Sequence, residues 1–354
     1  MTEISAEYLI IYSEKELEAL VKLFGQQDRH TTNRKRLGKW TTRIDFRILG
    51  PYSVPHVIRL LGFTPNLLIY DIRNGPPLTR GECTPADVLI ALAVNCSQLQ
   101  RLGWSGAGET PRYQDLVQLC NRLPNLVTLR LASIPVFSDS EPPLLILPNL
   151  RTLSLAVIPT LELRPETDLF MNYLSVQPRQ LPALECLECD KLQSMPFFQI
   201  HGHKICLFHT TAYGIPKESL PLCSNLESFV ISQGSEQLNF PIFPIFHPTI
   251  QKICIIPSAE ADIDVHQGIF EQIVMMHLDS MLKSVEQMDA PRLIELRIRN
   301  IGAFGILDQS SSWLQSWQRR WNIRGIHFLD KSGVSFHEVY DRMFTFPVDI
   351  YLLT

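Results

Sequence analysis

A nine-residue phrase occurs twice in this chain and constrains its fold more than any other feature. It reads LPNLVTLRL at residues 123–131 and LPNLRTLSL at residues 147–155, an offset of 24 residues. A period of about 20–29 residues with the apolar frame L-x-x-L-x-L is typical of a leucine-rich-repeat solenoid. Each repeat buries its apolar side only against the next one, so the phrase predicts an array that continues in both directions.

The frame recurs in weaker form along most of the chain, with apolar residues at its first, fourth and sixth positions. Steps between first positions vary, for instance 27 residues from Leu99 to Leu126 and 43 residues from Ile250 to Leu293. This irregularity predicts variable helices and loops between the strands. In chain order the frames are Thr41/Ile44/Phe46, Leu67/Tyr70/Ile72, Leu99/Leu102/Trp104, Leu126/Leu129/Leu131, Leu150/Leu153/Leu155, Leu184/Leu187/Cys189, Ile205/Leu207 (as fourth and sixth), Leu226/Phe229/Ile231, Ile250/Ile253/Ile255, Leu293/Leu296/Ile298 and Ile323/Ile326/Phe328.

Segments before several frames carry apolar residues at spacings of three and four. Residues 55–61, 85–94 and 113–123 therefore predict amphipathic helices. Thr84 and Thr110, each followed by proline, resemble helix starts in which threonine is the cap. We predict an α/β leucine-rich-repeat solenoid, in which a curved parallel sheet forms the concave face and helices and loops form the convex face.

We expect one continuous domain that is capped at both ends. Residues 1–39 would form a capping strand and helix, residues 40–330 the irregular repeats, and residues 331–354 a C-terminal cap or tail. Leu17, Leu20, Val21 and Phe24 would form the inward side of the first helix. Trp313, Trp317 and Trp321 recur every four residues, which predicts a last helix packed against the final repeats.

Composition excludes several functional classes. The net charge of −4 is mild, so bulk electrostatics predict neither a nucleic-acid partner nor a membrane surface. The sequence has no apolar run of the ~18 residues that a spanning helix needs and no basic, apolar N-terminus of the signal-peptide kind. We therefore expect a cytoplasmic or nuclear protein.

The eight cysteines are scattered through the repeats, which favours reduced core thiols over disulfides. Cys186 and Cys189 are spaced like half of a zinc site. They fall at the third and sixth positions of one frame, however, and should point to opposite faces. We expect no metal and no cofactor.

Catalytic motifs are absent from the sequence. It contains no Walker sequence, no G-x-S-x-G and no H-E-x-x-H. Asp45 and Asp71 fall on neighbouring predicted strands, and we interpret them as solvated surface carboxylates and not as a catalytic dyad. The chain is therefore predicted not to be an enzyme.

The frame identifies a candidate binding face, because residues between the inward positions of a strand point to the opposite side. Arginines gather there near the two ends of the predicted array, and the middle is small, neutral or acidic. They could engage carboxylates of a protein partner through bidentate contacts, or they could only keep the exposed strands soluble. The candidate partner-binding residues are Arg43, Arg47, Arg73, Arg101, Arg130, Asp190, Arg297 and Arg299, and Arg324 extends the second group.

The chain resembles the leucine-rich-repeat portion of F-box-type proteins that are abundant in mushroom-forming fungi. The resemblance is carried by AEYLIIYSEKELEALVKLF (residues 6–24), GKWTTRIDF (38–46), LLGFTPNLLIY (60–70), the segment 99–131 and LPALECLECDKL (181–192). It implies the substrate-recognition part of a ubiquitin-ligase receptor, in which an F-box recruits the ligase adaptor and the repeats hold the target.

No F-box phrase of the form L-P-x-E precedes residue 6. The chain is therefore expected to be either an F-box-less relative or the receptor half of a longer protein, and an adaptor would bind only if an F-box were supplied upstream. The alternative function is a free-standing repeat scaffold or inhibitor unrelated to ubiquitination. The sequence leaves the identity of the protein target and the oligomeric state open.

Overall fold

The computed structural model confirms the predicted α/β solenoid. It describes residues 7–30, 37–73, 83–106, 109–132, 134–137, 143–155, 165–189, 194–211, 218–232, 243, 246–257, 267–299 and 307–335. The backbone divides into two compact units, Met1–Lys204 and Ile205–Thr354. In each unit the strands are parallel and follow one another in sequence order, and helices alternate with them.

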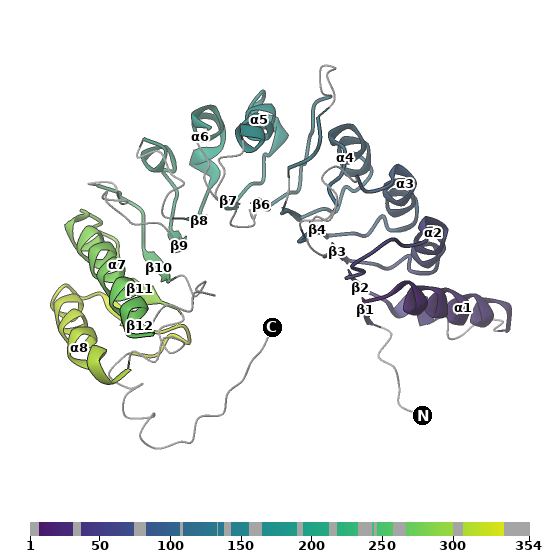
Figure 1. Cartoon of the computed structure of the whole chain (residues 1–354). Helices are drawn as coiled ribbons and strands as arrows, with labels where there is room; N and C mark the ends of the chain where they lie inside the picture. The colour runs from purple at the N-terminus through teal and green to yellow at the C-terminus, as the bar shows by residue number, and fades with distance from the viewer. Residues whose placement is uncertain are drawn as a thin grey trace. The chain divides into compact units, whose positions relative to one another are not determined.

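In the first unit, short strands line the inner side of the arc and helices lie on its outer side (Figure 1). Neighbouring strands pair without offset, so that equivalent frame positions form columns across the sheet. The elements are β1 (Tyr8–Ile11), α1 (Glu14–His30), η1 (Leu37–Trp40), β2 (Arg43–Phe46), α2 (Val54–Phe63), β3 (Ile69–Ile72), α3 (Ala86–Asn95), β4 (Arg101–Trp104), α4 (Tyr113–Cys120), β5 (Thr128–Leu131), β6 (Thr152–Leu155), α5 (Pro165–Tyr173), η2 (Pro178–Gln180), β7 (Cys186–Cys189), α6 (Met195–His201) and η3 (Gly202–Lys204).

The second unit repeats this arrangement with longer helices at its C-terminal end. Its elements are β8 (Leu207–Thr211), η4 (Leu220–Leu222), β9 (Ser228–Ser232), β10 (Lys252–Ile256), α7 (Gln267–Gln287), β11 (Glu295–Ile298), α8 (Leu307–Ile323) and β12 (His327–Leu329).

The core lies between the sheet and the helices, where the first, fourth and sixth frame positions point. Leu126, Leu129 and Leu131 are buried there, as the repeated phrase predicts. The asparagine of the same phrase links repeats: the Asn125 side-chain amide donates to the carbonyl of Ser97, and equivalent amides at other repeats do the same. Apolar burial and a polar contact at each turn thus arise from one short motif.

The predicted frame at Ile205 is wrong. Leu207 pairs with Ser228 and Phe208 with Phe229, so Ile205 occupies the first position and not the fourth. The apolar pattern predicted the wrong frame because Thr210, a polar residue, occupies the inward sixth position, where it is buried. The side chain at the outward fifth position is consequently His209 and not that of Cys206.

The last predicted frame is also wrong. Ile323 ends α8 and is 86% exposed, and it is Phe328 that occupies the fourth position, opposite Leu296. Gly325, with φ of 71°, follows the helix in the left-handed conformation that commonly ends helices. The apolar pattern therefore predicted a strand where the chain forms the end of a helix and a turn.

The predicted threonine caps are wrong as well. Helix α3 begins at Ala86 with Pro85 at its N-cap, and α4 begins at Tyr113 with Arg112 at its N-cap. The hydroxyl of Thr84 is buried and accepts a hydrogen bond of 2.9 Å from the indole of Trp104. Buried indole N–H groups usually find an acceptor, and here the hydroxyl of Thr84 accepts from Trp104 instead of capping the helix.

The predicted end helices form as expected where the structure describes them. Leu17, Val21 and Phe24 of α1 are buried and Leu20 is half-buried. Near the other end Trp317 and Trp321 are buried, and α7 supplies Asp279 as acceptor for two indole N–H groups of α8. Residues 1–6, 31–36 and 336–354 of the expected caps lie outside the described residues.

Candidate functional site

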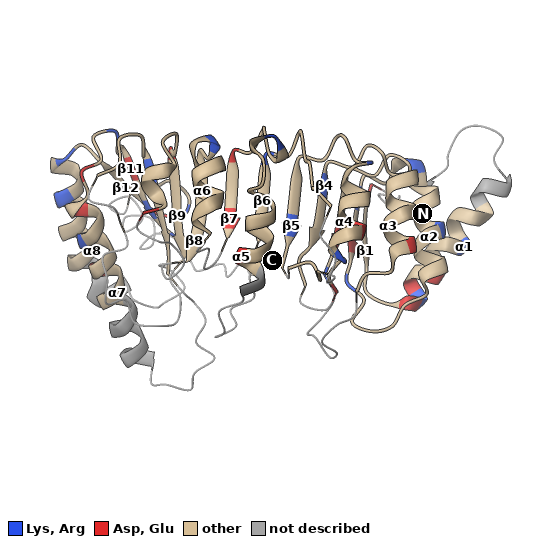
Figure 2. Ribbon diagram, turned by 90° about the horizontal axis from the view of Figure 1, so that it is seen from above, with Lys and Arg blue, Asp and Glu red and all other residues tan. Residues whose placement is uncertain are grey.

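Four arginines of the first unit lie on the outward side of β2–β4, the side away from the helices. Arg43 and Arg101 occupy third frame positions, and Arg47 and Arg73 occupy seventh positions. Between them, at the fifth positions of β2 and β3, lie Asp45 and Asp71. Figure 2 shows how charged positions continue on the neighbouring strands, basic on β5 and acidic on β7. We call the six residues of β2–β4 and their flanks (Arg43, Asp45, Arg47, Asp71, Arg73 and Arg101) the basic face.

Asp45 is completely buried, and its interpretation as a solvated surface carboxylate is wrong. Arg43 donates to it from both Nε and Nη2, at 2.9 and 3.1 Å, Tyr8 Oη donates at 2.8 Å, and Arg47 Nη2 donates at 3.2 Å. Burial raises the pKa of Asp45, but hydrogen bonds from Arg43, Tyr8 and Arg47 together outweigh burial and leave the pKa below its usual value. The carboxylate is therefore charged and holds two guanidinium groups in place.

Asp71 is also buried, at 3% exposure, so the same correction applies to it. Its carboxylate accepts from Arg73 Nε at 2.7 Å and from Ser105 Oγ at 2.5 Å. The side chain reaches toward the neighbouring strand across Gly103, where an added Cβ would lie 2.4 Å from Asp71 Oδ1. Glycine at this position therefore makes room for the carboxylate.

A physical reason for this burial follows from side-chain length. The third, fifth and seventh positions of one strand share a face, so a short aspartate at the fifth position lies between two long arginines. Arg43 and Arg47 fold over Asp45 and cover it from solvent. Sequence alternation gave the side on which these residues lie but could not show that the arginine tips close above the aspartate.

Two tyrosines that the sequence interpretation missed extend the basic face at its N-terminal edge. The guanidinium of Arg43 lies 4.5 Å from the ring centroid of Tyr8, and that of Arg47 lies 5.8 Å from the ring of Tyr12. The two residues are exposed, Tyr8 at 40% and Tyr12 at 53%. The signal was available, because Tyr8 takes the third position of β1 opposite Arg43. Such stacking fixes the guanidinium planes and places aromatic surface beside positive charge.

Arg101 differs from the other three arginines. It is half-buried and has no hydrogen bond or ion pair with any residue that the structure describes. The four arginines face two aspartates, so the basic face carries two uncompensated positive charges. Arg101 is the arginine on this face whose charge is unpaired within the described part of the chain.

The remaining predicted residues do not join the basic face. Arg130 on β5 donates to Ser154 at 3.3 Å and to Glu188 on β7 at 3.2 Å, so its charge is internally compensated. Asp190 lies outside the described residues.

The second predicted group of arginines lies in the second unit and divides between two places. Arg297 pairs with Glu295 on its own strand, and Arg299 follows that strand and is exposed. Arg324 lies elsewhere, because its guanidinium packs over Trp321 and donates to the backbone carbonyl of Glu286. The expectation that Arg324 extends this group is therefore wrong.

Cys189 is buried at the sixth position, whereas Cys186 is half-buried at the third, as the frame predicted. All eight cysteines are free thiols. Within the described ranges, no three His, Cys, Asp or Glu side chains come together in a way that could hold a metal ion.

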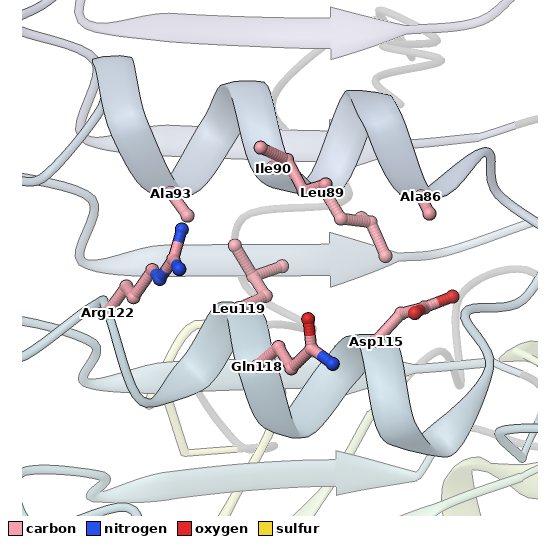
Figure 3. Close-up of a pocket in the computed structure, with 8 residues that line it drawn as sticks. All are labelled: Ala86, Leu89, Ile90, Ala93, Asp115, Gln118, Leu119 and Arg122. Atoms are coloured by element: carbon pink, nitrogen blue, oxygen red, sulfur yellow. The ribbon is translucent and has the colours of Figure 1, made fainter.

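A small groove lies on the helical side of the first unit, between α3 and α4 (Figure 3). Its volume is about 210 Å³. Leu89, Ile90 and Leu119 form its apolar part, and Asp115 and Arg122 lie toward its opposite ends. The groove holds one carboxylate and one guanidinium and has no further ionisable group in its lining.

Buried ionisable chemistry also occurs at His201, at the end of α6. Its Nε2 donates to the carbonyl of Leu174 at 2.8 Å, and its Nδ1 accepts from Lys204 Nζ at 3.0 Å. Burial lowers the pKa of His201 to about 4. The imidazole is therefore neutral near pH 7 and acts as a structural link between repeats.

Comparison with protein-family models and with curated proteins gives no match for this chain. None of the helices in the described ranges has the length and apolar character needed to cross a lipid bilayer.

Proposed function

We propose that this chain is a protein-binding repeat module whose partner contacts the basic face of the first unit. The observation that carries the proposal is the pair of uncompensated positive charges on that face, with Arg101 unpaired among the described residues. A half-buried guanidinium without an acceptor among the described residues is suited to a carboxylate of another molecule.

The arrangement of the other arginines supports the same proposal. Arg43, Arg47 and Arg73 remain 35%, 30% and 37% exposed although each contacts a buried aspartate. An aspartate holds each guanidinium while part of the arginine side chain stays exposed. A partner therefore meets side chains that are already ordered, which reduces the entropy lost on binding. Arginine and tyrosine are also the residue types enriched among the anchors of interfaces.

The resemblance to F-box-type receptors gives this proposal a biological form. In that form the chain is the substrate-recognition part of a ubiquitin-ligase receptor, it acts in the cytoplasm or nucleus, and it performs no catalysis itself. A ligase adaptor would bind only through an F-box supplied upstream. A free-standing scaffold or inhibitor would use the same face without an adaptor.

Charge reversal at Arg101 is the most informative perturbation. Reversing Arg43, Arg47 or Arg73 would place a carboxylate beside buried Asp45 or Asp71 and would destabilise the fold together with any interface. Arg101→Glu breaks no ion pair, because Arg101 has no partner among the described residues. Arg122→Glu is the matched control, since Arg122 is an exposed arginine of the same unit on the helical side.

The experiment is quantitative affinity purification of the tagged chain and both variants from cells of its source, followed by mass spectrometry. A partner that is retained by wild type and Arg122→Glu and lost with Arg101→Glu supports the proposal, provided that the melting temperatures agree. Co-purified ligase adaptor would favour the receptor form, and a stoichiometric partner without adaptor would favour the scaffold or inhibitor. Partners that are all insensitive to Arg101→Glu would refute the proposal.

A further inference from the structure

The third frame positions of the first unit form one row that crosses its strands. In order across β1–β5 the row reads Tyr8, Arg43, Ile69, Arg101 and Thr128. Neighbouring strands lie about 4.8 Å apart, so Arg43 and Arg101 are separated by about 10 Å along the row. The half-buried apolar side chain of Ile69 lies between them.

This row differs from the parallel row of seventh positions. Arg47 and Arg73 are adjacent there, and both contact the buried aspartates. In the third-position row Arg43 gives Nε and Nη2 to Asp45 and keeps Nη1, while Arg101 keeps its whole guanidinium. The third-position row therefore presents a cation, an apolar side chain and a second cation.

We propose that the basic face binds a protein segment that presents an apolar side chain between two carboxylates and lies across β2–β4. The inference rests on the proposed function and specifies the chemistry of the partner. Arg43 and Arg101 take the two carboxylates, and Ile69 contacts the apolar group between them. Charge complementarity of this kind sets which partner binds and in which register.

A nucleic-acid strand matches the row less well. Its backbone would place another phosphate and not an apolar group opposite Ile69. Beyond Arg101 the third-position row continues over β5–β7 as Thr128, Thr152 and Cys186, without a further cation. Arg130, at the fifth position of β5, is compensated by Glu188. The distribution therefore favours a short pattern of two charges over a uniform line of charge.

Two labelled peptides of identical composition test this inference by fluorescence anisotropy with the full chain. One contains Glu-Ser-Leu-Ser-Glu, and the other contains Leu-Ser-Glu-Ser-Glu in the same flanks. In an extended peptide alternate side chains share a face, so only the first places leucine between the carboxylates. We expect the first peptide to bind at least about fivefold more tightly, and binding to weaken as salt is raised.

Variants then assign the contacts. Arg101→Ala should weaken the first peptide about tenfold, in line with the loss of one hydrogen-bonded charge contact. Ile69→Thr should reduce the preference between the two peptides, and Arg122→Ala should leave both affinities unchanged. Should Arg101→Ala lower the melting temperature, Arg101→Gln replaces it, because glutamine retains the aliphatic stem without the charge.

Equal affinity of wild type for the two peptides would overturn the inference, as would tighter binding of a single-stranded oligonucleotide of equal charge. The outcome is separable from that of the proposed function. If the peptides are not distinguished but a natural partner is still lost with Arg101→Glu, the acidic–apolar–acidic pattern is wrong and the protein-binding face stands. If neither depends on Arg101, both proposals fail.

Discussion

Replacing Gly103 by alanine should displace the Asp71 carboxylate and thereby disturb the basic face. The added Cβ would lie 2.4 Å from Asp71 Oδ1 and 3.2 Å from Asp71 Cγ. Strand β4 is hydrogen-bonded on both sides, to β3 and β5, so its backbone cannot retreat. The carboxylate must move instead, and it then loses the hydrogen bond from Ser105 and its fixed geometry with Arg73.

The magnitude follows from these contacts. Adding a methyl group to a tightly packed site costs about 1–3 kcal/mol, and a hydrogen bond to a charged group contributes about 1.5–3 kcal/mol. Arg73 is 37% exposed and can follow the carboxylate, so we place the loss near the middle of the first range, at about 2 kcal/mol. For a body of 150–250 residues this corresponds to a fall in melting temperature of about 4–8 °C.

A double-mutant cycle measured by urea unfolding and circular dichroism tests the cause. In an Asp71→Ala background the added methyl group meets no carboxylate, so Gly103→Ala should then cost less than about 0.5 kcal/mol. The reasoning is refuted if Gly103→Ala is neutral in the wild-type background, or if its full cost persists after Asp71 is removed.

Three further predictions concern other polar contacts. Tyr8→Phe keeps the ring beside Arg43 but removes a hydrogen-bond donor to Asp45. We expect the free energy of unfolding in urea to fall by about 1 kcal/mol. The acid unfolding midpoint should move to higher pH, because the pKa of Asp45 rises toward its usual value. Burial lowers the pKa of His201 to about 4, so its imidazole is neutral in the folded state near pH 7. Its contribution to stability is therefore complete above about pH 6.5 and is lost as the pH falls through 4. Over this window the unfolding free energy of the wild type should drop by about 3 kcal/mol more than that of His201→Gln. Asp279→Ala leaves two indole donors unpaired and should lower stability by about 2 kcal/mol in thermal unfolding, whereas Lys283→Ala breaks only an exposed pair and should change it by less than about 0.5 kcal/mol.

The sequence predicted most of the architecture because the repeat makes local and global preferences agree. In the frames from residue 41 to residue 189, the apolar first, fourth and sixth positions correctly gave the inward side of each strand. The prediction failed where that agreement is broken. Thr210 puts a polar group at an inward position, and the residues before β12 continue an apolar pattern through a helix end.

The candidate site was predictable in position but not in electrostatics. Alternation placed Arg43, Asp45 and Arg47 on the outward face, and the structure places them there. Burial of the aspartate depends on how long side chains fold over a short one and on the approach of Tyr8 from the next strand. The spacing of residues in the sequence predicts neither of these contacts. The buried aspartates hold Arg43, Arg47 and Arg73, whereas Arg101 has no such partner among the described residues.

Site-specific photo-crosslinking tests the central claim, which is that a protein partner occupies the strand face of the first unit. A photoreactive phenylalanine analogue at Thr128, next to Arg101 in the third-position row, should crosslink the partner whose binding is abolished by Arg101→Glu. The same analogue at Gln118, on the helical side of this unit, should not. Crosslinks to that partner from Gln118 and none from Thr128 would contradict the account.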